Sequence, residues 1–259
     1  MTKKKVLAVA GVLGIAALVL SAGTLAYFTD TDKATNTFTM GNVDIKLIEE
    51  QRNEDGTALE DFEQDKVLMP LVGSAQDSHK DQWGMTERDY AKNYVDKMVS
   101  VKNVGASDAY VRLYIAFPSE LDNDDPSKNI IHWNFGNFEN NGAFATTYAN
   151  KWNWLKADGS WNYSRQTIDG VDYNVYIADY INPLEKAKST EYAISGFYLD
   201  KNVDYSNGNY TINGNTINFD FSKGVNVLVK AVAVQSDGFD NADEAVTAAF
   251  GASFNPFAE

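Results

Sequence analysis

Apolar and polar residues alternate most regularly near the middle of the chain. Two such runs, 95–101 and 111–117, lie on either side of a turn at 103–108 that contains Gly105. Alternation with a period of two places every second side chain on one face of a strand. Two such runs around a short turn are typical of a β-hairpin. The pattern therefore predicts a hairpin with one buried face, ending at Pro118.

Further short strands are expected along the rest of the chain. Alternating or apolar patterns occur at 43–48, 130–135, 151–155, 171–181, 190–199, 209–221 and 226–234. Within 209–221, the pair Asn213–Gly214 predicts a tight hairpin turn, because both residues tolerate the positive φ angles of a two-residue turn. The run 226–234 is almost entirely apolar, which is typical of a central strand.

The period changes near the C-terminus. The small apolar residues that recur there at helical spacing are Ala242, Ala245, Val246 and Ala249. Asp240 or Asn241 can cap the start of this helix, and Gly251 follows its end. Many short strands followed by one late helix predict a mainly β fold: an antiparallel β-sandwich or jelly roll with a short C-terminal helix.

The N-terminus has the layout of an export signal. Lysines at 3–5 precede an apolar run at 6–20, and small residues then lead to Ala26. This order predicts a secretory signal peptide over 1–26, cut between Ala26 and Tyr27. The alternative is an uncleaved anchor, since the apolar stretch approaches the roughly 20 residues of a bilayer span. Both alternatives place the rest of the chain outside the cytoplasm.

The remaining sequence divides into two parts. Residues 27–42 form a polar, threonine-rich extended segment, which is a solvated linker, a strand of its own domain or a segment freed by a cut for another molecule. Residues 43–259 are expected to form a single jelly-roll-like domain, whose middle, about 119–210, is rich in insertions. The chain has no cysteine, so disulfides and thiolate sites are excluded.

The charge balance excludes one class of partner. The chain has 22 basic and 36 acidic residues and a formal charge of −14. Removing 1–26 takes away three lysines and no acid, which gives −14 − 3 = −17. A strongly acidic surface repels nucleic acid, so binding to DNA or RNA is not expected.

Catalytic chemistry has little support in the residues. The two histidines, His79 and His132, are far apart in the sequence and belong to no zinc motif. No phosphate-binding loop and no serine-nucleophile motif is present. The acidic loop at 121–129 offers Asp122, Asp124 and Asp125 as weak calcium candidates, although such loops are usually turns. We therefore expect a non-enzymatic protein without a cofactor, calcium excepted.

Aromatic residues are concentrated between 133 and 163. They are Trp133, Phe135, Phe138, Phe144, Tyr148, Trp152, Trp154, Trp161 and Tyr163. Rings of this kind can stack on sugars, whereas packing within a core or across strands is their commoner role. Both interpretations stay open at this point.

Three segments carry a resemblance to a known family. GTLAYFTDTDKATNTFTMGNVDIKL at the N-terminus resembles the exported substrates of SipW-type signal peptidases in Gram-positive bacteria, which include TasA and camelysin-like proteins. VSVKNVGASDAYVRLYI and AVAVQSDGFDNADEAVTAAFG are similar to the hairpin and the last strand and helix of that family. Together the three cover roughly a quarter of the chain, and no such resemblance is recognised in 119–210.

The resemblance implies a fibre subunit. A SipW-type peptidase would cut after Ala26, and the freed segment would insert as a donor strand into the next subunit. Tyr27, Phe28, Phe38 and Met40 would belong to that strand, with the two phenylalanines as its apolar contacts. Self-association into filaments, with other matrix proteins as further partners, would follow.

The sequence thus favours a secreted structural protein of the cell surface or biofilm matrix. One alternative is a non-polymerising surface adhesin or carbohydrate-binding module. Another is a metallopeptidase of the camelysin type, which the missing zinc motif disfavours.

Overall fold

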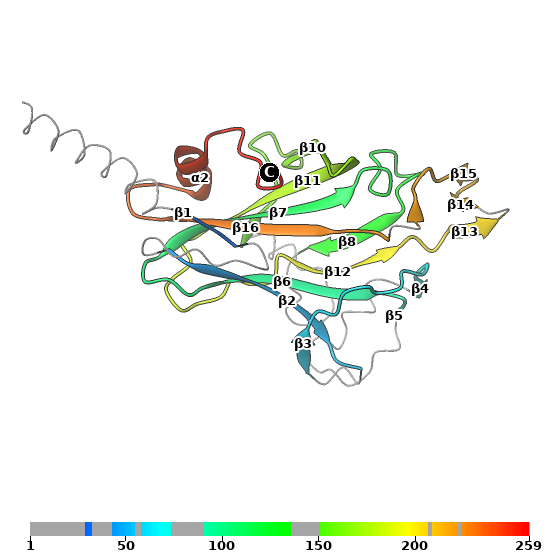
Figure 1. Cartoon of the computed structure of the whole chain (residues 1–259), viewed down its shortest axis with the longest axis horizontal. Coiled ribbons are helices and arrows are strands. Elements are labelled where there is room, and N and C mark those ends of the chain that lie inside the picture. Colours follow the sequence, from blue (N-terminus) through cyan, green and yellow to red (C-terminus); the bar gives the residue numbers. More distant parts are fainter. Residues whose placement is uncertain are drawn as a thin grey trace, which may run out of the picture.

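A computed structural model gives the fold of the chain (Figure 1). It describes residues 29–32, 43–54, 58–73, 91–135, 151–206, 209–221 and 224–258. Two antiparallel sheets are stacked face to face with the apolar core between them, so the predicted mainly β sandwich with one short C-terminal helix is confirmed.

The first sheet has six strands. Its order is β1 (Thr29–Asp32), β16 (Leu228–Gln235), β7 (Ala109–Pro118), β11 (Val171–Tyr180) and β10 (Tyr163–Ile168), with β9 (Trp152–Asn153) also paired to β11. All of these pairings are antiparallel. β1 and β10 therefore lie at opposite ends of this sheet.

The second sheet has five strands. Its order is β3 (Leu59–Asp61), β2 (Ile45–Arg52), β6 (Val95–Asn103), β12 (Ile194–Leu199) and β8 (Ile131–Phe135). Two small sheets complete the β structure of the described residues. One contains β13 (Val203–Ser206), β14 (Asn209–Ile212) and β15 (Asn215–Thr216), and the other contains β4 (Val72–Gly73) and β5 (Ala91–Lys92).

The strands predicted around 103–108 exist, but the predicted hairpin is wrong. β6 pairs with β2 and β12, whereas β7 pairs with β16 and β11 in the other sheet. The intervening turn therefore crosses from one sheet to the other. The buried side chain of Asn103 holds this crossing, because its Nδ2 donates to the carbonyls of Ser107 and Leu184 and its Oδ1 accepts from the backbone of Gly105.

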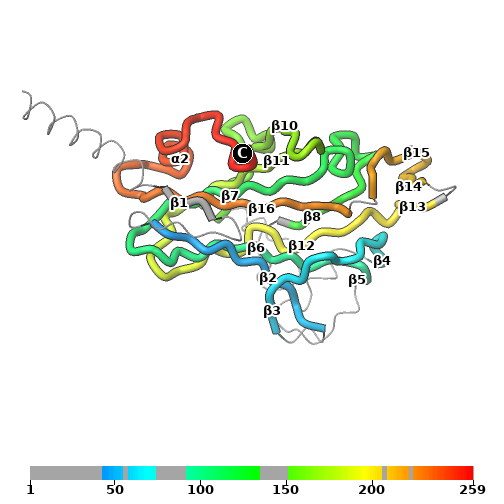
Figure 2. The backbone as a smooth tube through the Cα atoms, in the orientation of Figure 1, coloured from blue at the N-terminus to red at the C-terminus, as the bar shows by residue number. Residues whose placement is uncertain are grey.

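Both faces of β7 are buried, although only one was expected to be. Val111, Leu113 and Ile115 point into the core between the sheets, while Tyr110 and Tyr114 belong to a second apolar cluster on the outer face. α2 (Ala242–Phe250) and the C-terminal segment cover that outer face (Figure 2). The second face carries Tyr110, Arg112, Tyr114 and Ala116, and all four are buried, which explains why the alternation was misleading.

Several other predictions are confirmed. Asn213 and Gly214 both have positive φ, 48° and 81°, and join β14 to β15. The side chain of Asn241 accepts from the backbone of Glu244 at the start of α2, and Gly251 ends the helix with φ 91°. β10, by contrast, is a strand in a stretch for which the sequence pattern predicted none.

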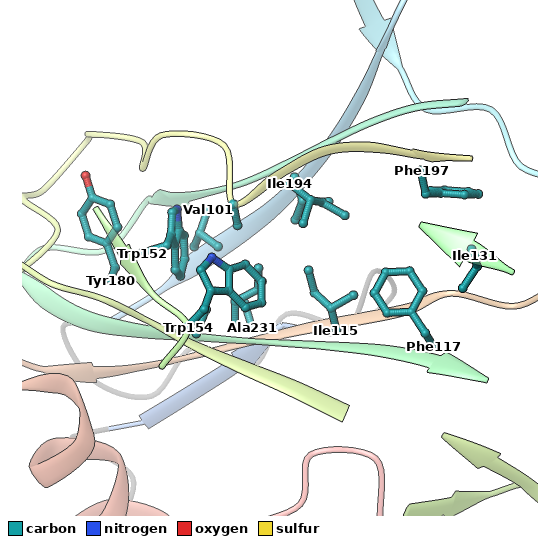
Figure 3. Packing of buried hydrophobic residues seen from close by; sticks show 14 of the residues in the cluster. Val101, Ile115, Phe117, Ile131, Trp152, Trp154, Tyr180, Ile194, Phe197 and Ala231 are labelled. Atoms are coloured by element: carbon teal, nitrogen blue, oxygen red, sulfur yellow. The ribbon is translucent and has the colours of Figure 1, made fainter. Parts of the chain in front are cut away.

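The core holds the two main sheets together (Figure 3). Trp152 and Trp154, only 2% and 3% exposed, lie among aliphatic residues of both sheets, including Val101, Ile115 and Ile194. In the part of the chain that the structure describes, no helix is both long enough and apolar enough to cross a membrane.

Candidate functional site

The N-terminal strand closes one edge of the six-stranded sheet. β1 runs antiparallel to β16, with Thr29 opposite Val234 and Asp32 opposite Ala231. The four residues of β16 in this ladder, 231–234, are 0% exposed. β1 is thus the outermost strand and lies beside a stretch of β16 whose side chains are fully enclosed.

The sequence of β16 explains why this edge needs a partner. Ala231 and Ala233 face the core between the sheets, and Val232 and Val234 face the cluster beneath α2. Both faces of this stretch are covered by apolar side chains. Without β1, the backbone N–H and C=O groups along its outer edge would be left unpaired. Unpaired backbone groups are energetically costly, and an open strand edge is a template for another strand. The outer edge of β16 is therefore a binding site for a β-strand, and β1 occupies it.

The described part of the expected donor segment is thus a strand of its own domain. This is one of the three alternatives that the sequence left open for residues 27–42. Tyr27, Phe28, Phe38 and Met40 lie outside the described residues, as does the cleavage site between Ala26 and Tyr27.

A charge network around the buried Arg112 fixes the sheet next to this edge. Arg112 lies on β7, opposite Val232 of β16. Its guanidinium donates to both carboxylate oxygens of Asp179 on β11, at 2.6 and 2.8 Å. Its Nη2 also donates to Asp243 in the first turn of α2, at 2.7 Å. Burial alone would lower the pKa of Arg112, but the hydrogen bonds and charge of Asp179, followed by Asp243, raise it. The network thus links β7 to β11 and to α2, next to β16.

The three calcium candidates have separate hydrogen-bond partners. Asp122 accepts from Asn174 and Tyr176, whereas Asp124 accepts from Tyr163 and Arg165. Asp125 accepts from Ser127 and forms an ion pair with Lys128. Across the described ranges, no group of three or more metal-ligating side chains lies close enough together to hold an ion.

Only one of the two histidines is described. His132 on β8 lies 3.0 Å from Asp200, measured from Nε2 to Oδ2, and its ring stacks on Tyr198. His79 lies outside the described residues.

The aromatic residues predicted between 133 and 163 separate into two groups. Trp152 and Trp154 are core residues, which is the packing role. Trp133, Trp161 and Tyr163 are half-buried around Tyr176, which the sequence analysis did not single out. Its alternating position on β11 was the only available signal. Phe138, Phe144, Tyr148 and the side chain of Phe135 are not described.

Comparison with known proteins bears on the N-terminal segment. Residues 1–52 match the family model described as camelysin metallo-endopeptidase. No curated protein and no solved structure matches the chain. The expected resemblance to camelysin-like proteins is confirmed over this stretch.

The camelysin match spans one strand of each main sheet. It contains β1 in the six-stranded sheet and ends with β2 in the five-stranded sheet. Its last residue, Arg52, is anchored to β6 by two hydrogen bonds of 2.7 Å to the buried carboxylate of Asp96. The matched segment is thus attached to the domain at β2 by a buried ion pair, whereas β1 is attached by its pairing with the edge of β16.

Proposed function

We propose that this chain is an exported structural protein of the cell surface or extracellular matrix, and that its N-terminal strand links one subunit to the next. The main observation that supports this proposal is the backbone pairing of β1 with Ala231–Val234 at the outer edge of β16. The camelysin match over 1–52 supports a surface or matrix location.

The energetics of such a link follow from the ladder. If β1 of one chain replaces β1 of another on β16, the same backbone pairs form, so the exchange is nearly balanced in free energy and concentration decides its extent. Residues 33–42 join β1 to Val43, and a chain of that length reaches at most about 35 Å. A head-to-tail contact of this kind does not close on itself, so it extends into a filament.

Export and cleavage would control the exchange. Before cleavage, the apolar run at 6–20 holds the segment at the membrane. Cleavage after Ala26 by a signal peptidase of the SipW type then releases Tyr27 and the strand that follows it. Assembly is thereby restricted to chains that have left the cytoplasm.

Peptidase activity is not part of the proposal. The name of the matched family includes metallo-endopeptidase, but the match ends at Arg52. Within the described ranges no cluster of metal ligands accompanies it. Hydrolysis of a protein substrate by the pure chain, stopped by a chelator and restored by zinc, would contradict a purely structural role.

The test compares two proteins, one beginning at Tyr27 and one at Gly41, by negative-stain electron microscopy. We expect filaments only from the first. A synthetic peptide of residues 27–40, added in excess, should shorten those filaments by occupying β16. Monomers from both proteins, or filaments from both, would overturn the proposal, provided that circular dichroism shows the shorter protein to be folded.

A further inference from the structure

A pocket of about 250 Å³ lies at the end of the sandwich opposite β1. It is formed where β8, the last strand of the five-stranded sheet, meets β11 and the residues before β10 in the six-stranded sheet. The loop that follows β7 contributes its floor through Asp122 and Asn129. No residue of β1 or β16 lines this pocket, so its chemistry is independent of the proposed assembly edge.

One wall of the pocket consists of aromatic rings. The centroids of Trp133, Trp161 and Tyr176 lie 5.1 to 5.8 Å from one another. All three side chains are half-buried, and Phe117 stacks on Trp133 from the core side at 5.5 Å. Large rings held rigid from behind offer apolar surface to a ligand at little cost in conformational entropy.

The floor of the pocket is polar, and hydrogen bonds from Asn174 and Tyr176 hold its main acidic residue, Asp122, in place. Asp122 is 5% exposed, and its Oδ2 accepts from Asn174 Nδ2 at 2.9 Å and from the Tyr176 hydroxyl at 2.8 Å. Asn174, 0% exposed, also donates to the Asp122 carbonyl at 2.7 Å. These bonds fix the direction of the carboxylate, because a buried acceptor held by two donors cannot rotate freely.

Two further polar residues, Asn129 and His132, line the pocket. Asn129 Oδ1 is buried and has no hydrogen-bond partner in the part of the chain that the structure describes. Such an atom is an exception that calls for an explanation, and a ligand donor is one. The His132 ring, placed by Asp200, supplies a group that can donate or accept according to its protonation and tautomer.

The charges select the class of ligand. The buried carboxylate of Asp122 would repel a phosphate, sulfate or uronate in the pocket. Two cations near this loop do not offset it, since Arg165 pairs with Asp124 and Lys128 lies 3.6 Å from Asp125. A neutral ligand with several hydroxyl groups fits better, because each hydroxyl can donate to a carboxylate or amide oxygen.

The size limits the ligand further. The volume lies below the roughly 300–1,000 Å³ of pockets that hold drug-sized molecules, so one ring suits it better than a longer ligand. A pyranose has an apolar face of C–H groups and an edge of hydroxyls, which matches an aromatic wall beside a polar floor.

We propose that this pocket binds one neutral pyranose unit of a polysaccharide, stacked on Trp161 and Trp133 and hydrogen-bonded to Asp122, Asn129 and His132. The site would attach the protein to neutral glycan at the cell surface or in the surrounding matrix. It goes beyond the assembly function, because a protein lacking β1 retains every one of these residues.

The test uses isothermal titration of the protein beginning at Tyr27 with maltotetraose, cellotetraose, laminaritetraose and mannotetraose, and with trigalacturonate as the acidic comparison. We expect at least one neutral tetrasaccharide to bind and trigalacturonate not to bind. Trp161→Ala and Asp122→Asn should each weaken binding by about tenfold or more. Tyr205→Ala, which removes an exposed ring on β13 away from the pocket, should leave it unchanged.

Two results would overturn the proposal. One is the absence of binding to all four neutral tetrasaccharides. The other is binding that Trp161→Ala and Asp122→Asn leave intact while both variants remain folded by circular dichroism. Repeating the titration with the protein beginning at Gly41 separates this site from assembly, since loss of filaments should not change the affinity.

Discussion

Arg112 and Asp179 face each other across neighbouring strands, and the guanidinium donates to both oxygens of the carboxylate, at 2.6 and 2.8 Å. The side chains are 10% and 16% exposed, so this is an ion pair largely out of water. The same guanidinium reaches Asp243, whose side chain is 76% exposed. One cation therefore has a sheltered partner and a solvated partner.

Removing the cation should be costly. Arg112→Leu leaves the Asp179 carboxylate in place without its partner, and we expect a loss of about 3–5 kcal/mol in the free energy of unfolding. Asp243→Asn is the matched control, and its effect should stay within about 1 kcal/mol because water screens that contact. Urea unfolding followed by circular dichroism measures both. Equal losses in the two variants would contradict this account of the network.

The turn that carries the chain between the sheets depends on Asn103. Asn103→Ala removes two donated hydrogen bonds, to the carbonyls of Ser107 and Leu184, and should lower the free energy of unfolding by about 1–3 kcal/mol. Asn103→Asp should cost at least as much at neutral pH, since it points a carboxylate at two carbonyl oxygens. Thermal unfolding of both variants provides the comparison. A fully stable Asn103→Asp protein would show that the donated bonds are unimportant.

Asp122 should give stability a recognisable pH dependence. Burial raises the pKa of its carboxyl above the ordinary 3.8, and the charge of Asp124 adds to this, whereas Asn174, Tyr176 and His132 oppose it. Because the folded chain then holds this proton more tightly than the unfolded chain, the stability from this group is present at low pH. It is lost as pH rises through the folded pKa.

Asp122→Asn removes that titration. The free energy of unfolding of the variant, minus that of the natural protein, should therefore increase as pH rises above about 4 and level off once the carboxyl is fully ionised. Urea unfolding at intervals from about pH 4 to pH 7 supplies the values. A difference that stays constant, or that falls as pH rises, would show that burial does not raise this pKa.

Local structure was more predictable from the sequence than pairing was. The alternation at 95–101 and 111–117 identified two strands, and Asn213–Gly214 identified a hairpin, because each depends on nearby residues only. The assignment of β6 and β7 to different sheets depends on β2 and β16, which are distant in sequence. Period-two patterns carry no information about which strand lies alongside.

The candidate sites were also hard to predict, because they too depend on which distant segments lie side by side. Composition and the N-terminal pattern directed attention to 27–42, whereas nothing local indicated that Thr29–Asp32 would lie beside Ala231–Val234. Trp133 and Trp161 were recognised as rings that could stack on a sugar. Their convergence with Asp122 and Tyr176 arises from four separate segments of the chain.

The central claim is that β1 of one subunit occupies β16 of another, and cysteine cross-linking tests it most directly. The chain has no cysteine of its own, and Thr31 lies opposite Val232, at a spacing that a disulfide can bridge. Thr31→Cys and Val232→Cys are placed on separate chains, one of them carrying a C-terminal tag, and mixed under assembly conditions before oxidation. Val229→Cys replaces Val232→Cys as the out-of-register control, about 10 Å further along the strand.

We predict a disulfide-linked heterodimer from the Thr31→Cys and Val232→Cys mixture, and none when Val229→Cys is the partner. The double variant in a single chain should cross-link within the monomer when dilute and between chains in filaments. If the mixture gives no heterodimer while the double variant cross-links only within its own chain, β1 stays in its own domain and the proposed link between subunits is wrong.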